Sequence, residues 1–186
     1  MSIPTRIPEI VVTYEDYLEL PDDGKRYEIL DGEISIQLTP TPWHQMISGN
    51  LLVQPMDHIQ KHDLGQVFHA RLAVILSSTC VVEPDLMFVS KARKEILTDR
   101  AIEGAPDLLI EISSPATVHT DRVTKAQIYA RHKVPAYWIV DPEQETVEVY
   151  LLNVDSYRLE TTLHGETPQP APPFTDLKIA AKDIFI

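Results

Sequence analysis

The sequence predicts a mixed α/β protein, in an α+β arrangement, with a central mixed β-sheet flanked by helices. Short apolar runs such as 81–89 and 108–113 are rich in branched residues, which is typical of buried strands. From Trp43 to about His62, apolar residues instead recur at the spacing of one helix face. The 186 residues, 44% of them hydrophobic, suit one core, so we expect one domain over 13–186 after an N-terminal extension over 1–12.

The first part of the chain is divided by strong capping and turn signals. Thr13, followed by Asp16, is typical of a helix N-cap. The Asp31-Gly32 pair supplies the positive-φ positions of a tight hairpin turn, and Pro55 predicts a kink or a break in the long helix. We therefore expect a short helix over 13–20, hairpin strands over 27–30 and 33–36, and a helix over 43–62.

The rest of the chain alternates between strand patterns and one further helix. Val134-Pro135 ends that helix, because the residue before a proline is disfavoured in the helical conformation. Residues 91–103 are polar and mixed in charge, which predicts a loop with about one helical turn. We expect strands over 67–76, 81–89 and 108–113, a helix over 121–133, strands over 136–140 and 146–152, and a last short strand over 177–179.

Two acidic residues, Asp85 and Glu111, fall inside apolar runs that we expect at the buried centre of the sheet. An isolated carboxylate loses several kcal/mol on burial unless a cation, a metal or hydrogen bonds compensate it. If the two strands are neighbours, opposed side chains lie about 5 Å apart, and both carboxylates can bind one Mg²⁺ at about 2.1 Å. The alternative for Asp85 is a surface acid on an edge strand. The same alternative is weaker for Glu111, because its neighbours in the sequence are apolar.

Lys125 is a third candidate because of its place on the predicted helix. Asp121, Lys125 and Tyr129 share one helix face through their spacing of four residues, and this polar strip can face the sheet. An ammonium beside a metal-bound water orients that water and stabilises negative charge in a transition state. The alternative is an exposed pair between Asp121 and Lys125, which contributes roughly a few tenths of a kcal/mol.

The charge of the chain limits its partners. A net charge of −12 argues against nucleic acid, since phosphate binding depends on Lys and Arg. The stretch from Arg122 to Lys133, however, contains basic residues and no acid. This stretch is either a local basic face or an ordinary solvated helix surface.

Targeting and cysteine signals are few. The first ten residues lack an apolar stretch of signal-peptide length, and no segment is apolar enough for a membrane span. The single cysteine, Cys80, offers no disulfide framework or thiolate metal cluster, and its apolar surroundings predict a buried inert thiol. We therefore expect a cytoplasmic protein without a membrane partner.

An ordered set of motifs runs across nearly the whole chain. Its segments are Arg26–Glu33, Pro42–His44, Glu83–Leu86, Gly104–Pro115, Asp121–Tyr129 and Val134–Pro142. Together they resemble the Uma-two family of restriction-endonuclease-like proteins, which belongs to the PD-(D/E)XK nuclease superfamily. The resemblance implies a restriction-endonuclease-like core and metal-dependent hydrolysis of phosphodiester bonds.

The resemblance also implies roles for particular residues. Asp85 corresponds to the motif aspartate and Glu111 to the acid of the next strand. The superfamily places a lysine two residues after that acid, where this chain has Ser113, and Lys125 resembles a migrated lysine. Glu28 resembles the N-terminal acid that joins or supports the metal site. The implied catalytic residues are Glu28, Asp85, Glu111 and Lys125, and the implied ligands of Mg²⁺ or Mn²⁺ are Asp85, Glu111 and the Ile112 carbonyl.

Four further residues are candidates for contact with substrate. His44, just before the long helix, either contacts a phosphate or metal shell, or is a capping or surface histidine. Arg122 belongs to the basic stretch, and Gln127 and Tyr129 on the same helix are candidates for lining a cleft. The resemblance implies a nucleic-acid partner, with DNA favoured over RNA, and a homodimer.

Two functions from other classes are also compatible with the sequence. A catalytically weak or silent nuclease fold, acting as a nucleic-acid-binding or regulatory module, agrees with the charge of −12. The retained acid, acid, lysine set instead favours an endonuclease. A purely structural or interaction protein gives no reason to bury Asp85 and Glu111.

Overall fold

The computed structural model describes residues 10–186. Most of the predicted N-terminal extension over 1–12 therefore lies outside the described residues, as do nine of the first ten residues, in which no signal peptide is expected. The helical segments are α1 (Tyr14–Leu18), α2 (Pro42–Lys61), η1 (Lys91–Ile96), η2 (Thr120–Lys125), α3 (Ala126–Arg131) and η3 (Ala181–Asp183). The strands are β1 (Arg26–Leu30), β2 (Glu33–Gln37), β3 (Gly65–His69), β4 (Val74–Ser77), β5 (Cys80–Val82), β6 (Leu86–Ser90), β7 (Ile102–Glu103), β8 (Leu108–Ile112), β9 (Ala136–Asp141), β10 (Thr146–Asn153), β11 (Ser156–His164), β12 (Gln169–Pro170) and β13 (Lys178–Ile179).

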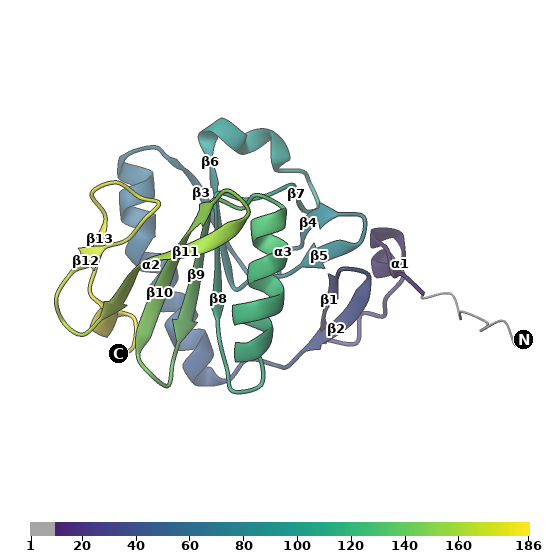
Figure 1. Ribbon diagram of the computed structural model, residues 1–186, viewed down its shortest axis with the longest axis horizontal. Helices are drawn as coiled ribbons and strands as arrows, with labels where there is room; N and C mark the ends of the chain where they lie inside the picture. Colours follow the sequence, from purple (N-terminus) through teal and green to yellow (C-terminus); the bar gives the residue numbers. More distant parts are fainter. Residues whose placement is uncertain (1–9) are drawn as a thin grey trace, which may run out of the picture.

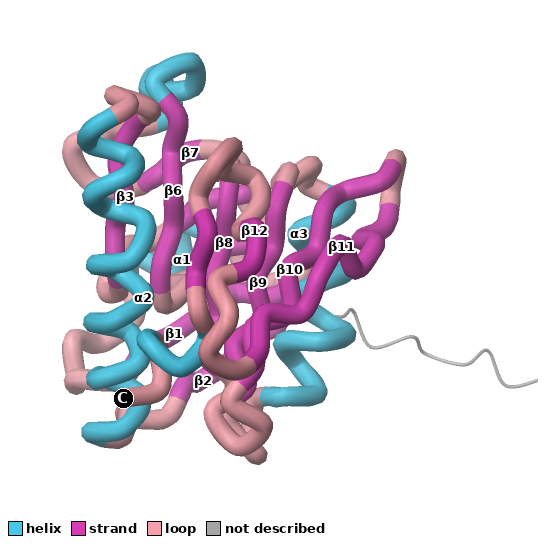
Figure 2. Tube along the Cα trace, turned by 90° about the vertical axis from the view of Figure 1, so that its left-hand side faces the viewer, coloured by secondary structure: helices cyan, strands magenta, loops and turns pink. Residues whose placement is uncertain are grey.

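The strands form two larger sheets and a two-stranded ribbon. The six-stranded sheet has the order β11-β10-β9-β8-β6-β3, in which β8 and β9 are parallel and β6 and β8 antiparallel. The five-stranded sheet has the order β2-β1-β5-β4-β7. Figure 1 shows α2 and α3 on opposite faces of the larger sheet, and the rotated view of Figure 2 shows the same layers. The predicted class, a mixed sheet flanked by helices, is confirmed.

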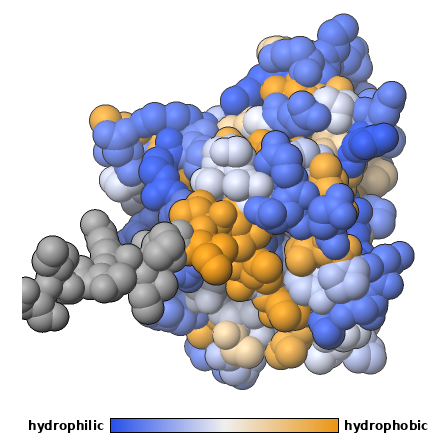
Figure 3. All heavy atoms as spheres, turned by 90° about the vertical axis from the view of Figure 1, so that its right-hand side faces the viewer, coloured by the Kyte–Doolittle hydropathy of each residue, from blue (hydrophilic) through white to orange (hydrophobic). Residues whose placement is uncertain are grey.

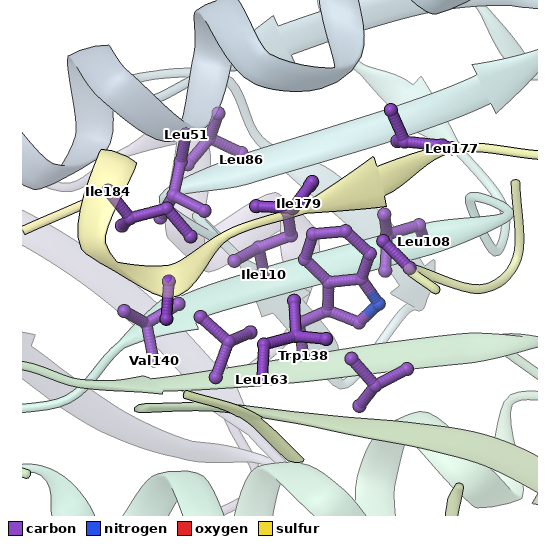
Figure 4. Packing of buried hydrophobic residues seen from close by; sticks show 14 of the residues in the cluster. Leu51, Leu86, Leu108, Ile110, Trp138, Val140, Leu163, Leu177, Ile179 and Ile184 are labelled. Carbon is purple, nitrogen blue, oxygen red and sulfur yellow. The ribbon is translucent and has the colours of Figure 1, made fainter. Parts of the chain in front are cut away.

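The main hydrophobic core fills the space between α2 and the six-stranded sheet. Leu51 of α2 packs with Ile110 of β8 and Trp138 of β9, and the C-terminal segment closes this layer through Ile179. Figure 4 shows these side chains pointing toward one another around the indole ring. Because successive side chains of a strand alternate between its faces, the residue after Ile110 points to the other face, under η2 and α3.

A long bent hairpin connects the two sheets. β3 pairs with β6 in one sheet, and β4 pairs with β5 in the other, both antiparallel. The predicted strands over 67–76 and 81–89 are therefore wrong in extent, since each divides where the chain crosses between sheets, at 70–73 and 83–85. Pro84 has no N–H for a strand ladder, and the Ala70 N–H donates to the Asp85 carbonyl at 3.0 Å across the bend. Asp85 consequently lies at the bend rather than inside a strand.

Other elements depart from expectation in smaller ways. α2 continues through Pro55, because Leu51 and Ile59 anchor the same face in the core and outweigh one lost hydrogen bond. β11 was not predicted, since it is an edge strand with mostly polar or partly exposed residues.

The N-cap at Thr13 is confirmed, with a reciprocal bond to Asp16. Among residues 10–186, no helix is long and apolar enough to cross a membrane.

Candidate active site

Asp85 is placed beside β8 by the bend of the long hairpin. Leu86 of β6 pairs with Ile110 of β8, so the register puts Asp85 opposite Glu111. The side chain of Asp85 is buried, and its Oδ2 accepts a hydrogen bond from the Ile112 amide at 2.9 Å. Asp85 and Glu111 are therefore neighbours, as expected, although Asp85 lies on a bend and not on a strand.

Two basic side chains hold the other positions around Asp85. Arg26 Nη1 of β1 lies 3.2 Å from Oδ1, and His44 Nε2 of α2 lies 3.2 Å from Oδ2. Burial acts to raise the pKa of Asp85, but the contacts with His44, Arg26 and the Ile112 amide outweigh burial and hold it below the ordinary value. Asp85 is thus a charged, buried carboxylate surrounded by donors.

Glu111 lies on the face of β8 that packs under η2 and α3, in a different environment. Its Oε1 accepts hydrogen bonds from the Tyr129 hydroxyl at 2.7 Å and from Lys125 Nζ at 2.9 Å. Burial raises the pKa of Glu111 to about 8; Lys125 opposes this shift, and neighbouring carboxylates add to it. Asp85 and Glu111 therefore differ: contacts hold the pKa of Asp85 below its ordinary value, whereas burial raises the pKa of Glu111.

Lys125 reaches Glu111 because its helix opens with a wide turn. η2 is π-helical, and Asp121 and Lys125 are both buried within it, as is Tyr129 in α3. The predicted strip of these three residues therefore faces the sheet, and the alternative of an exposed pair is wrong. Burial acts to lower the pKa of Lys125, but Glu111, Glu28 and Asp121 outweigh burial and raise it above the ordinary value. The ammonium, with 2% of the residue exposed, stays charged.

Glu28 brings the five-stranded sheet into the site. It lies on β1 with 0% of the residue exposed, and its Oε1 accepts from Lys125 Nζ and from the Glu83 amide, both at 2.9 Å. Its Oε2 accepts from Gln37 Nε2 of β2 at 2.7 Å. Lys125 is consequently clamped between carboxylates of two different sheets.

Ser113 occupies the position where the superfamily pattern has its lysine, and it supports Asp121 instead. Its hydroxyl donates to Asp121 Oδ2 at 2.9 Å. Burial raises the pKa of Asp121, while Lys125 and Ser113 act against that rise. The serine therefore fixes the start of the helix that carries the ammonium.

A cavity of about 320 Å³ opens onto this group of residues. Asp85, Glu111 and Lys125 line it, whereas Glu28 lies behind the lysine and is not part of the wall. Its other polar lining residues are Arg26, Gln37, Thr39, Thr41, His44, Ser113, Ser114, Thr117, Asp121 and Glu143. Its apolar lining residues are Leu38, Pro40, Trp43, Ile112, Pro115 and Pro142. The cavity thus combines charged groups with apolar and aromatic side chains.

The residues predicted to contact substrate are separated by the fold. His44 lines the cavity at Asp85. Tyr129 is fully buried beneath it, where its hydroxyl serves Glu111. Arg122 and Gln127 line a different cavity, of about 350 Å³, against β9 to β11, and Arg122 is paired there with Glu148. Their contact with substrate stays a prediction.

Sequence reasoning did not single out three residues that complete the site. Arg26 contacts Asp85, Gln37 contacts Glu28, and Glu83 lies 3.5 Å from Arg26 Nε through its Oε2. Arg26 and Glu28 are two residues apart on one strand, so they share a face, and this spacing was the available signal for Arg26. Gln37 and Glu83 carried no such signal, because their roles depend on how the sheets meet.

A divalent cation fits the charge of this site. Among residues 10–186, no three or more His, Cys, Asp or Glu side chains are arranged to hold a metal. The predicted ligand set, however, needs two carboxylates and a main-chain carbonyl only. Buried carboxyl groups outnumber the cationic side chains beside them: the acids are Glu28, Glu83, Asp85, Glu111 and Asp121, and the cations are Arg26, Arg71 and Lys125. A hard cation with oxygen ligands would add positive charge to this acidic site.

The layered mixed sheet, the facing acids just before β6 and on β8, and the lysine on the following helix define a protein of the restriction-endonuclease-like class. The family model Uma2, described as putative restriction endonuclease, matches residues 14–182, and the chain belongs to this family. The crystal structure of a putative nuclease belonging to DUF820 from Anabaena variabilis matches with a TM-score of 0.76 and 22% identity, over 94% of this chain and 97% of that one. This likeness shows a shared fold. A comparison with curated proteins found no match.

Proposed function

We propose that this chain is a metal-dependent endonuclease that hydrolyses phosphodiester bonds, with DNA as substrate and Mg²⁺ or Mn²⁺ as cofactor. One observation carries the proposal: Asp85, at the bend before β6, lies opposite Glu111 of β8, and Lys125 lines the same cavity with its ammonium fixed in place. Membership of a family described as putative restriction endonucleases supports it.

The ligand roles follow from the donor types. Asp85, Glu111 and the carbonyl of Ile112 would hold the cation, since hard divalent ions prefer oxygen ligands. When bound, Mg²⁺ or Mn²⁺ lowers the pKa of a water molecule and neutralises charge on a phosphate. Arg26 and His44, which contact Asp85, would donate hydrogen bonds to oxygen atoms of the substrate.

Lys125 has the geometry of a residue that positions a nucleophile. Its Nζ donates to Glu28 and Glu111 at 2.9 Å each, so the direction of its third N–H is fixed. That N–H can donate to the attacking water or to a non-bridging phosphate oxygen, where negative charge develops during in-line displacement. Glu28 acts as the positioning residue for this ammonium.

Cleavage assays with matched variants test the proposal. Plasmid and single-stranded DNA are incubated with Mg²⁺ or Mn²⁺ and with the wild type, Asp85→Ala, Glu111→Ala or Lys125→Ala. The matched controls are Asp63→Ala and Lys91→Ala, an exposed acid and lysine that pair with each other and line none of the three cavities. We expect chelator-sensitive cleavage by the wild type and controls and at least a hundredfold loss in the three site variants. Equal residual activity in all six would indicate a contaminating nuclease and contradict the proposal.

A silent nucleic-acid-binding module is the second candidate function. One observation favours it: both carboxylate oxygens of Asp85 are already engaged by Arg26, His44 and the Ile112 amide. Such a module binds nucleic acid equally well with Mg²⁺ or with a chelator, and binds no cation at Asp85. The endonuclease requires the opposite result in both measurements.

A homodimer belongs to the same proposal. β2 is an edge strand of its sheet, and Ile34 and Ile36 on it are exposed, as are Ile10 and Val11 before α1. Figure 3 shows apolar residues gathered on the side of the molecule where these elements lie. Exposed apolar groups of this kind mark association surfaces. Sedimentation of the wild type and of an Ile34→Glu, Ile36→Glu double variant tests it: the wild type sediments as a dimer and the variant as a monomer, whereas a monomeric wild type contradicts it.

A further inference from the structure

A second cavity adjoins the candidate active site on the far side of Arg26. Its volume is about 330 Å³, and Arg26, Asp85 and the segment 37–40 belong to the walls of both cavities. A ligand that spans the two therefore passes directly over Asp85. The two cavities are therefore adjacent and share part of their walls.

The second cavity differs from the first in its chemistry. Lys25, His69 and Arg71 line it, together with Gln45 and Ser48 from the first turns of α2. These side chains are hydrogen-bond donors or cations, and they lie together on a chain whose net charge is −12. Leu38 and Pro40 line both cavities, whereas Trp43 lines the first cavity and not the second. Lys25 and Arg71 line the second cavity and not the first. The second cavity thus suits an anion, and Trp43 offers a flat aromatic group to a ligand in the first.

The bend of the long hairpin brings the two main cations together. Arg71 lies where the chain crosses from β3 to β4, and Lys25 immediately precedes β1. The Arg71 guanidinium donates through Nη2 to the Lys25 carbonyl, which holds the two residues side by side. Their side chains are 49% and 55% exposed, so both charges remain accessible to a ligand from solution.

The acids near these cations do not neutralise them strongly. Asp23 pairs with Lys25 at 2.7 Å, but this pair is exposed, and exposed pairs contribute only about 0–1 kcal/mol. Glu83 Oε2 lies 3.9 Å from Arg71 Nε, beyond hydrogen-bond distance, and this buried oxygen has no hydrogen-bond partner. Lys25 and Arg71 can therefore replace these contacts with a phosphate at little cost in free energy.

We propose that the cavity lined by Lys25, Arg71, Gln45 and Ser48 binds the sugar–phosphate backbone of the nucleic acid next to the bond that is cut. This proposal rests on the proposed nuclease function and adds the direction in which the strand lies. Lys25 and Arg71 pair with phosphate oxygens, while Gln45 and Ser48 donate hydrogen bonds to them. Trp43 in the first cavity then receives a base, since aromatic faces stack on bases of any sequence.

Binding measurements with charge-neutral variants test this subsite. Lys25→Gln and Arg71→Gln, alone and combined, are compared with Arg158→Gln, an exposed arginine on β11 paired with Glu160 and outside both cavities. Fluorescence anisotropy with labelled single-stranded and duplex DNA, in Ca²⁺ and over a range of salt concentrations, gives affinity and its salt slope. Mn²⁺ affinity and thermal melting are measured on the same proteins.

We expect each single variant to weaken DNA binding about three- to tenfold and to reduce the salt slope by about 1, because each removes one phosphate contact. In the Lys25 and Arg71 variants KM rises, whereas kcat and Mn²⁺ affinity stay at the wild-type level. In Arg158→Gln the DNA affinity, salt slope, KM, kcat and Mn²⁺ affinity all stay at the wild-type level. Should Arg71→Gln melt early through its lost carbonyl contact, Lys25→Gln, which keeps that contact, gives the answer. If Lys25→Gln and the double variant bind DNA with wild-type affinity and salt slope, the proposed subsite is wrong. That result leaves the proposed nuclease function unaffected. A wild type that neither binds nor cleaves DNA overturns both.

Discussion

The ammonium of Lys125 lies 2.9 Å from Oε1 of Glu111, and both residues are buried where two sheets and a helix meet. The same ammonium is 2.9 Å from Glu28 of the other sheet. One cation thus compensates two carboxylates that would otherwise repel each other. This relationship joins the stability of the fold to the chemistry of the site, and each can be measured separately.

Removal of the ammonium destabilises the protein. In Lys125→Met, Glu28 and Glu111 lose their shared cation, and breaking a buried pair in this way costs about 3–5 kcal/mol. Urea unfolding with a chelator present measures this loss. Adding Glu111→Gln to the same chain should recover part of it, because one uncompensated acid is removed. The matched control is Lys133→Met, an exposed lysine, which should change the free energy of unfolding by less than about 1 kcal/mol.

The stability of the metal-free protein depends on pH through Glu111. Its folded pKa of about 8 lies above the ordinary value of 4.5, so between these values the folded state binds a proton that the unfolded state has released. The free energy of unfolding contributed by Glu111 therefore falls as pH rises through this window and levels off above about 8. Urea unfolding from about pH 5 to pH 9 should show this fall in the wild type and a flatter curve in Glu111→Gln. Identical curves would rule out the shifted carboxyl.

We expect Arg26 to compete with a metal for Asp85. Its guanidinium lies 3.2 Å from Oδ1, so replacement by a neutral residue removes a positive charge from the place where a cation would bind. We expect Arg26→Gln to bind Mn²⁺ more tightly by about tenfold, or about 1.4 kcal/mol, and to cleave more slowly. Calorimetric titration gives the affinity. Weaker Mn²⁺ binding in this variant would show that Arg26 builds the metal site instead of competing with it.

Two glycines give opposite results on replacement by alanine. A Cβ at Gly65 would lie 2.2 Å from the Val89 carbonyl oxygen, a backbone atom of the paired strand, whereas a Cβ at Gly49 in α2 meets nothing within 4 Å. Gly65→Ala should lose more than about 2 kcal/mol of stability. Gly49→Ala should gain about 0.5–1 kcal/mol through helix propensity. Thermal melting measures both changes, and the result for Gly65→Ala checks the register of β3 against β6.

The sequence predicted the parts of the site that depend on local pattern. Asp85 and Glu111 were identifiable because acids inside apolar runs are costly, and Lys125 because its helix spacing aligns it with Asp121 and Tyr129. The helix N-cap at Thr13 followed from local chemistry in the same way. These inferences needed no knowledge of which segments meet in space.

The parts that depend on the meeting of the two sheets could not be predicted. The division of each long strand at 70–73 and 83–85 reflects the crossing of a hairpin between sheets, and β-propensity alone does not mark such a crossing. Arg26 and Gln37 belong to a sheet whose approach to β8 is set by tertiary packing. Arg122 shows the converse, since it shares a helical segment with Lys125 and yet lines another cavity.

Titration of the protein with Mn²⁺ tests the central claim most directly, because it needs neither DNA nor turnover. The wild type is compared with Asp85→Asn and Glu111→Gln, which keep the shape of each side chain and remove its charge. We expect calorimetry to show one Mn²⁺ site per chain in the wild type and none in either variant, with thermal melting showing that both variants stay folded. Equal Mn²⁺ binding by all three proteins, or none by the wild type, would contradict it.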